Sequence, residues 1–169
     1  WRLAAVMDDP ATPVDTSVRS VLGQAMDTVA RAGCTIDRSP VLPVDLHDVA
    51  DLYTTMLRPV VDEDRGLTHT RWLASNERRL GLQQSMQDFF ARYDALLLPT
   101  FPVVAFPHDL RPSEHRTLDV DAVARPYSPT ALFWPALATL LHLPATALPV
   151  GLAPGGPAGL PVGLQVVGP

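Results

Sequence analysis

The last quarter of the chain, Pro126–Pro169, contains no aspartate, glutamate, lysine or arginine. A stretch of 44 residues without a charge is a poor candidate for a solvated surface, so we expect most of it to be buried. Two segments within it, Ala145–Val150 and Val162–Val167, are short, apolar and bounded by proline or glycine. They predict two buried strands, joined by a turn around Gly155 and Gly156.

A membrane-spanning helix is the main alternative for this stretch. Ala131–Ala153 offers 23 residues without a charge, and about 20 apolar residues are enough to cross a bilayer. However, Pro135, Pro144 and Pro149 interrupt any helix of that length. We therefore expect a buried helix followed by a buried strand, and no contact with a membrane.

Two blocks of sequence resemble the amidase signature family, whose members are serine hydrolases of amide bonds. The first block is Phe89–Thr100 (FFARYDALLLPT), in which a helix ending in Tyr-Asp leads into an apolar strand closed by Pro-Thr. The second is Leu143–Gly151 (LPATALPVG) followed by Gly159–Pro169 (GLPVGLQVVGP). The resemblance implies an α/β fold, with a partial mixed β-sheet flanked by helices, like the C-terminal half of the family's α/β/α fold.

Length and composition favour a single domain over residues 1–169. A chain of this length buries about 70% of its unfolded surface, and 47% hydrophobic residues can supply a core. The net charge of −5 and the lack of a basic run argue against nucleic-acid binding. The single cysteine, Cys34, suits a reducing cytoplasm, and we expect it to be buried and unreactive. Because the chain begins at Trp1, we expect it to be a piece of a longer protein.

The first third predicts a strand, a helix and a parallel strand. Arg2–Met7 is apolar, Asp15 can cap the following helix, Gly33 can end it, and Cys34–Ile36 begins the second strand. These elements form a βαβ unit. The helix is expected to bury one apolar stripe: Val18, Val21, Leu22, Ala25, Met26 and Val29.

Two helices are expected next. Asp45 can cap a helix over Leu46–Leu57, which Arg58-Pro59 should end. A loop over Val60–His69, with a solvated acidic run over Asp62–Asp64, leads to a long helix over Thr70–Tyr93. That helix is expected to turn these apolar side chains inward: Trp72, Leu73, Leu80, Met86, Phe89 and Phe90.

The second half begins with a buried strand over Ala95–Leu98, stopped by Pro99 and Thr100. Residues 101–125 hold several prolines and alternating charges, and predict a long, mobile surface loop. Ser128-Pro129 can then open a helix over Thr130–Leu141.

Amide hydrolysis needs a nucleophile, a base that activates it and donors for the oxyanion. The resemblance implies a serine nucleophile, a bridging serine and a lysine base. The chain has no lysine, and its seven serines stand apart from any glycine cluster. We therefore assign no catalytic residue here and expect these residues alone to be inactive. No cofactor and no metal are expected, because the histidines at 47, 69, 108, 115 and 142 lack metal-binding spacing.

The chain could instead supply part of a substrate pocket. Thr100 follows a predicted strand, and open α/β sheets bind ligands beyond the carboxyl ends of their parallel strands. The resemblance implies that Tyr127, Phe133 and Trp134 approach the acyl part of the substrate. Core packing remains the alternative for Phe133 and Trp134, and a simple turn for Thr100. His142 stands where the family has glycine, so it is either a titrating group near the site or a core histidine.

The resemblance thus implies the C-terminal part of an amidase that hydrolyses a small-molecule carboxylic amide through a serine acyl-enzyme. Assembly of that amidase into a homo-oligomer is compatible with this interpretation. Two alternatives remain open: the A subunit of a tRNA-dependent amidotransferase, and a non-catalytic interaction domain. The interaction domain predicts a monodisperse isolated chain. The amidase predicts exposed sheet edges and association of the isolated chain.

Overall fold

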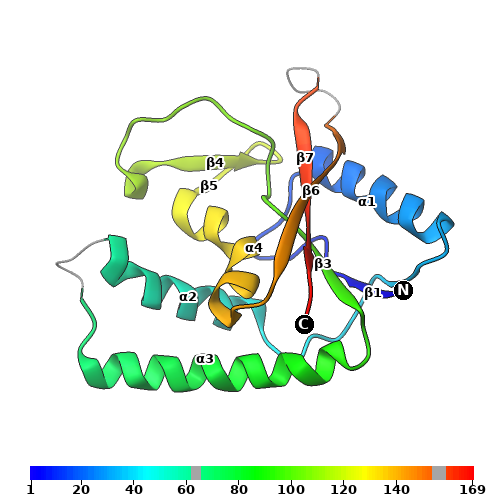
Figure 1. Ribbon diagram of the computed structural model, residues 1–169. Coiled ribbons are helices and arrows are strands. Elements are labelled where there is room, and N and C mark those ends of the chain that lie inside the picture. Colours follow the sequence, from blue (N-terminus) through cyan, green and yellow to red (C-terminus); the bar gives the residue numbers. More distant parts are fainter. Residues whose placement is uncertain (62–65, 154–158) are drawn as a thin grey trace.

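The structure is a computed structural model that describes residues 1–61, 66–153 and 159–169 (Figure 1). Its elements, in chain order, are β1 (Arg2–Ala5), α1 (Thr16–Arg31), β2 (Thr35–Asp37), α2 (Leu46–Val61), α3 (His69–Phe90), β3 (Ala95–Pro99), a 3₁₀ turn (Ser113–His115), β4 (Thr117–Val120), β5 (Val123–Pro126), α4 (Tyr127–Leu141), β6 (Ala145–Leu152) and β7 (Pro161–Val167).

Five strands form a mixed sheet in the order β2-β1-β3-β7-β6. β1 pairs in parallel with both β2 and β3, whereas β7 runs antiparallel to β3 and to β6. All five residues of β3 are buried, as expected of a central strand covered on both faces. The predicted α/β class, the mixed sheet and the parallel βαβ unit are confirmed.

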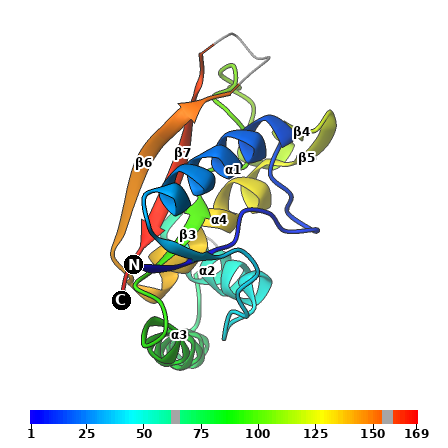
Figure 2. The same cartoon turned by 90° about the vertical axis from the view of Figure 1, so that its right-hand side faces the viewer.

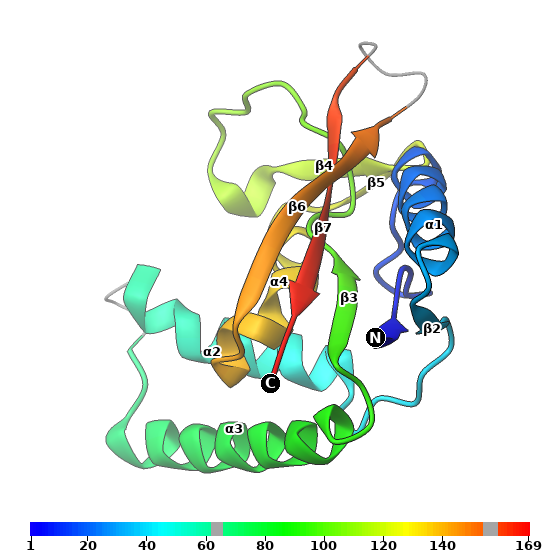
Figure 3. The ribbon, with the colours of Figure 1, turned by 45° about the vertical axis from the view of Figure 1, so that its right-hand side comes forward.

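Helices cover the two opposite faces of the sheet. A Cβ placed on Gly151 of β6 would lie 2.7 Å from Cγ1 of Val21, so α1 packs closely on that face. On the other face, the Gln165 side chain donates from Nε2 to the carbonyl oxygen of Trp134, at 2.9 Å, which ties β7 to α4. Figure 3 shows α4 behind the β6–β7 pair and α1 to the side of it. α3 runs beneath α2 and α4, and Figure 2 views it nearly end-on.

Both predicted helix caps are present. The Asp45 carboxylate accepts from the backbone amides of His47 and Asp48 at the start of α2. The Asp15 carboxylate accepts from the backbone amide of Ser17 at the start of α1. α1 ends at Arg31, and Gly33, two residues later, has a left-handed φ of 97°. Val18, Val21, Leu22 and Met26 of the predicted stripe are buried and Ala25 packs against the core, whereas Val29 is only half-buried.

Asp15 has a second role that the sequence did not reveal. It accepts from the Asp121 amide at 3.0 Å, and the Asp121 carboxylate accepts from the amide and hydroxyl of Thr16. Partial burial raises the pKa of Asp15, but hydrogen bonds from Ser17 and Asp121 outweigh this effect and hold the pKa below its usual 3.8. The carboxylate therefore contributes more stability when it is ionised.

Replacing Asp15 by alanine is expected to lower the free energy of unfolding at pH 7 by about 1–2 kcal/mol, because α1 loses its cap. The pKa of Asp15 is lower in the folded protein, so its contribution is complete above about pH 3.8. It fades as the pH falls from there through the folded pKa. Denaturant unfolding at several pH values measures both effects. Asp27→Ala, which removes an exposed ion pair with Arg38, should cost about 0.5 kcal/mol or less; equal losses for the two variants would contradict the assignment.

The expectation that Ala145–Val150 is a buried strand is wrong. The strand exists as β6, but nearly all its residues are exposed, because β6 is the edge strand of the sheet. β6 is covered chiefly by its pairing with β7 and its contact with α1. The strand over Val162–Val167 is confirmed as the inner strand β7. An uncharged, exposed edge is the feature that predicts association of the isolated chain.

Two expectations for the helices also need correction. α2 does not end at Arg58-Pro59 but continues to Val61, since a proline this close to the helix end removes a single hydrogen bond. In α3, Met86 and Phe89 are buried, but Trp72, Leu73 and Leu80 are exposed. α3 runs along the lower edge of the molecule (Figure 1).

The segment over 101–125 is not a loop throughout. It contains the 3₁₀ turn and then the hairpin β4–β5, whose Leu118 and Val120 point inward. Asp121 and Ala122 form its two-residue turn, both with positive φ. α4 begins at Tyr127, three residues earlier than expected.

Some expectations fall outside the described residues, namely the acidic run over Asp62–Asp64 and the turn at Gly155 and Gly156. Cys34 is half-buried rather than fully buried. Within the described ranges, none of the helices combines the length and the apolar character needed to cross a bilayer.

Candidate functional site

A cavity of about 370 Å³ lies at the carboxyl end of β3. Its walls come from four parts of the fold: Thr100 with the segment 101–106 that follows it, Val18 on α1, Tyr127 at the start of α4, and the first residues of β7, 161–163. In an open α/β sheet this is the edge at which ligands bind. Two of the residues predicted to contact substrate, Thr100 and Tyr127, therefore line the same cavity.

Thr100 is packed against Gly163 of β7. The Thr100 amide donates to the Gly163 carbonyl oxygen at 3.2 Å. A Cβ added to Gly163 would lie 2.8 Å from Thr100 Oγ1 and 3.0 Å from its Cβ, so only glycine leaves room for the threonine side chain in this position. Oγ1 of Thr100 is buried and has no hydrogen-bond partner among the described residues. A buried hydroxyl without a partner is costly, so the close packing of Thr100 against Gly163 leaves this oxygen unsatisfied.

Three aromatic rings surround the cavity. The rings of Phe101 and Phe106 are stacked, with centroids 6.1 Å apart, and Phe106 meets Tyr127 edge-on at 6.3 Å. The Tyr127 ring is held in turn by the Arg116 guanidinium, whose Cζ lies 5.7 Å from the ring centroid. The Tyr127 amide also donates to the carbonyl oxygen of Arg116, at 3.0 Å. The 3₁₀ turn and hairpin thus fix the position of Tyr127.

A second cavity of about 740 Å³ shares the segment 103–106 with the first and is more polar. Three of its charged residues, Asp15, Asp109 and Arg111, already have hydrogen-bond partners, and Asp119 also lines it. Asp109 forms hydrogen bonds with the Arg111 guanidinium, including one of 2.7 Å from Nη2, and these lower the pKa of Asp109 to about 2. Asp15 is engaged by Ser17 and Asp121, as described above.

Phe133 and Trp134 lie elsewhere. Their side chains are 5% and 1% exposed and belong to the hydrophobic core, and neither lines the cavity at Thr100. The Phe133 ring packs against that of His47, with centroids 4.9 Å apart. The structure favours the core alternative that the sequence had left open for these two residues.

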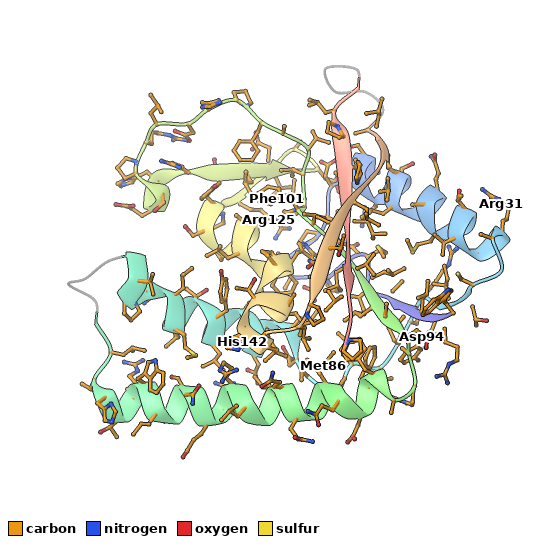
Figure 4. The ribbon with its side chains drawn as sticks, in the orientation of Figure 1. Arg31, Met86, Asp94, Phe101, Arg125 and His142 are labelled. Carbon is orange, nitrogen blue, oxygen red and sulfur yellow. The ribbon has the colours of Figure 1, made fainter. Side chains whose placement is uncertain are left out.

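His142 is not a core histidine. It is exposed at the C-terminal end of α4, with a left-handed backbone of φ 54° and ψ 37°. Tyr127 begins the same helix, so roughly 20 Å of helix axis separates the two residues. Figure 4 shows His142 well below Phe101. His142 therefore does not place a titrating group at the cavity.

Sequence reasoning missed Val18, Phe101, Phe106 and Gly163. Val18 was assigned to a core stripe, and the two phenylalanines were placed in a mobile loop. The glycine did carry a usable signal, because a glycine inside a strand often marks a close approach of another part of the chain. Across the described residues, no group of three or more histidine, cysteine, aspartate or glutamate side chains could hold a metal ion.

The chain is thus an α/β protein with a mixed sheet and an apolar cavity at the carboxyl end of a central strand. The family model named Amidase matches residues 55–169, which is more than half of the chain. The chain therefore belongs to the amidase signature family.

The curated relatives include the A subunits of glutamyl-tRNA(Gln) amidotransferases. The protein from Streptococcus equi subsp. zooepidemicus is 42% identical over 86 residues, which cover 51% of this chain and 15% of that protein. The chloroplastic/mitochondrial protein of Sorghum bicolor is 33% identical over 91 residues, covering 52% and 14%. The matched region thus spans about 15% of the length of these relatives.

Solved structures show the same fold at low sequence identity. A bacterial aryl acylamidase of the amidase signature family has a TM-score of 0.71 and 18% identity, covering 99% of this chain and 40% of that chain. The A subunit of the Thermotoga maritima glutamyl-tRNA(Gln) amidotransferase has a TM-score of 0.68 and 19% identity, covering 98% and 38%. At these identities the similarity defines the fold and leaves the substrate open.

Proposed function

We propose that the protein to which this chain belongs hydrolyses a linear carboxylic amide, and that the chain forms one side of its substrate pocket. The observation that carries the proposal is the cavity at the carboxyl end of β3, whose wall contains Thr100 and Tyr127. Thr100 and Tyr127 are the residues we assign to substrate binding. Membership in the amidase family supports the reaction class.

In the proposed reaction, a serine oxygen attacks the amide carbonyl carbon and its proton passes through the base to the leaving nitrogen. Ammonia or an amine leaves, and water then hydrolyses the acyl-enzyme ester to release the carboxylic acid. Both serines and the lysine base come from residues outside this chain, which contains no lysine. We propose no metal or cofactor for this chemistry, and a cytoplasmic location, which the single cysteine supports.

The test is to express the chain alone and the longest reading frame that contains it, and to measure the ammonium or amine released from simple amides. The longer protein should hydrolyse at least one amide, with a serine-reactive inhibitor abolishing the activity. The chain alone should be inactive because it lacks the base. Hydrolysis by the chain alone would contradict the proposed division of labour.

A second candidate is the A subunit of a tRNA-dependent amidotransferase, favoured by the names of the curated relatives. This function requires glutamine as the ammonia donor and a second protein that completes the complex. Co-purification of a stoichiometric partner, together with glutamine hydrolysis that rises when the partner is added, would support it over a free-standing amidase.

A further inference from the structure

We propose that the cavity at Thr100 binds an aromatic ring of an uncharged amide substrate. The inference rests on the proposed amide hydrolysis and adds to it the class of substrate. It also distinguishes the two candidate functions above, since glutamine carries two charges and no ring.

The cavity wall is apolar and, among the described residues, uncharged. Its lining is formed by apolar side chains and backbone, and among the described residues its only polar side chains are those of Thr100 and Tyr127, both hydroxyls. None of the described residues that line it is charged. Moving an ammonium or carboxylate group into such surroundings is strongly unfavourable unless a charged partner is present. An uncharged substrate pays no such penalty.

Three aromatic rings line the same cavity. Phe101, Phe106 and Tyr127 line one cavity and pack on one another, Phe101 stacked on Phe106 at 6.1 Å and Tyr127 edge-on to Phe106 at 6.3 Å. Aromatic rings attract one another in offset-stacked and edge-to-face arrangements at about 4.5–7 Å. A ring entering the cavity would therefore find partners for either geometry. An aliphatic chain would gain only the burial of its surface.

The cavity walls are held in place by contacts that do not depend on a substrate. Arg116 fixes Tyr127 through a backbone hydrogen bond and the contact with its ring. The segment carrying the phenylalanines is anchored where the Pro102 carbonyl oxygen accepts from the Asp15 amide, at 2.8 Å. A preformed cavity loses less entropy on binding, and about 370 Å³ lies within the range of small-molecule sites.

None of the charged residues that line the adjoining polar cavity lines the cavity at Thr100. Asp109 and Arg111 neutralise each other, and the Asp15 carboxylate is used by Ser17 and Asp121. His108 and Asp119 also line this second cavity, and neither lines the first. The lining of the apolar cavity therefore remains uncharged among the described residues, and it favours uncharged substrates.

The test uses the protein encoded by the longest reading frame that contains the chain, called the full-length protein below. Its five substrates are 2-phenylacetamide, acetanilide, 2-cyclohexylacetamide, acetamide and glutamine. We expect a ring-containing amide to have the highest kcat/KM, at least tenfold above acetamide and glutamine. Comparing 2-phenylacetamide with acetanilide shows whether the ring belongs to the acyl or the amine part, and 2-cyclohexylacetamide separates aromaticity from size.

Two matched variants make the test specific. Phe106 and Trp72 have similar exposed fractions, 43% and 44%, but only Phe106 lines the cavity. Phe106→Ala should lower kcat/KM for the ring-containing amide about tenfold, chiefly through KM, and change acetamide less than twofold. Trp72→Ala should leave kcat/KM unchanged for both the ring-containing amide and acetamide.

The inference is overturned if acetamide or glutamine is the best substrate, or if Phe106→Ala lowers hydrolysis of every amide equally. If no amide is hydrolysed, the proposed function fails, and calorimetric titration of the full-length protein with 2-phenylacetamide still decides the binding claim. Binding that weakens about tenfold in Phe106→Ala would uphold it, and no measurable binding would refute it.

Discussion

Gly163→Ala is expected to destabilise the protein by about 1–3 kcal/mol, the usual cost of forcing extra atoms into a packed site. The added Cβ would lie 2.8 Å from Thr100 Oγ1 and 3.0 Å from Thr100 Cβ, so the threonine side chain has to move. Because Thr100 lines the cavity, we also expect amide hydrolysis by the full-length protein to fall at least tenfold. A misplacement of about 1 Å at a substrate-positioning residue can cost about 100-fold in rate. Thermal unfolding and steady-state kinetics measure the two effects.

Two further variants separate crowding from other effects of alanine. Gly81→Ala adds its Cβ in open space on α3 and should be neutral or slightly stabilising, because alanine favours helix. Thr100→Ala removes the nearest atom, so adding it to Gly163→Ala should restore part of the lost stability. A Gly163→Ala protein as stable and as active as the unchanged one would show that β7 and Thr100 do not constrain each other.

Trp134→Ala is expected to have the largest effect on stability, a loss of about 3–5 kcal/mol in the free energy of unfolding. Trp134 is among the largest fully buried side chains, and the carbonyl oxygen of the same residue accepts from Gln165. Trp134→Phe keeps an aromatic ring in the core and should cost less than half as much. Denaturant unfolding of both variants gives the comparison.

The same variants decide the role that the sequence left open for Trp134. If Trp134 only packs in the core, Trp134→Phe should leave KM within about twofold of the unchanged protein, because a uniform loss of folded protein does not alter KM. A tenfold rise in KM with little loss of stability would instead place Trp134 against the substrate. Trp72→Ala, an exposed tryptophan, serves as the control for stability, with an expected change within about 0.5 kcal/mol.

The elements that could be predicted are those whose signals are local. The cap at Asp15, the left-handed Gly33 and the apolar stripe between them define α1 without reference to the rest of the chain. β3 was equally clear, since an unbroken run of apolar residues closed by Pro-Thr suits a strand covered on both faces. The family resemblance was carried by the same kind of short, contiguous blocks.

The errors concern burial, which depends on what lies next to an element in space. β6 has the composition of an inner strand, yet it occupies the edge of the sheet and is exposed. Trp72, Leu73 and Leu80 of α3 are as apolar as Met86 and Phe89. Only the latter two are buried. The hairpin β4–β5 was missed because its turn, Asp121-Ala122, lacks the glycine that usually marks such turns.

The candidate site was half predictable. Thr100 was found because the end of a strand is visible in sequence, and Tyr127 because of the family resemblance. Phe101 and Phe106 become wall residues only when the segment 101–106 folds back over the end of β3, which no periodicity indicates. Val18 joins them from more than eighty positions away, and only the packing of α1 brings it there.

The reciprocal contact between Asp15 and Asp121 has a consequence for the pocket. The Asp15 carboxylate accepts from the Asp121 amide, and the Asp121 carboxylate accepts from the Thr16 amide. The hairpin turn and the start of α1 are thereby joined across 106 positions of sequence. The family model begins only at residue 55, so one partner lies inside the matched region and the other outside it. Loss of either aspartate is expected to loosen the hairpin, which leads directly into Tyr127. A change in the N-terminal residues around Asp15 can therefore reach the pocket through the hairpin.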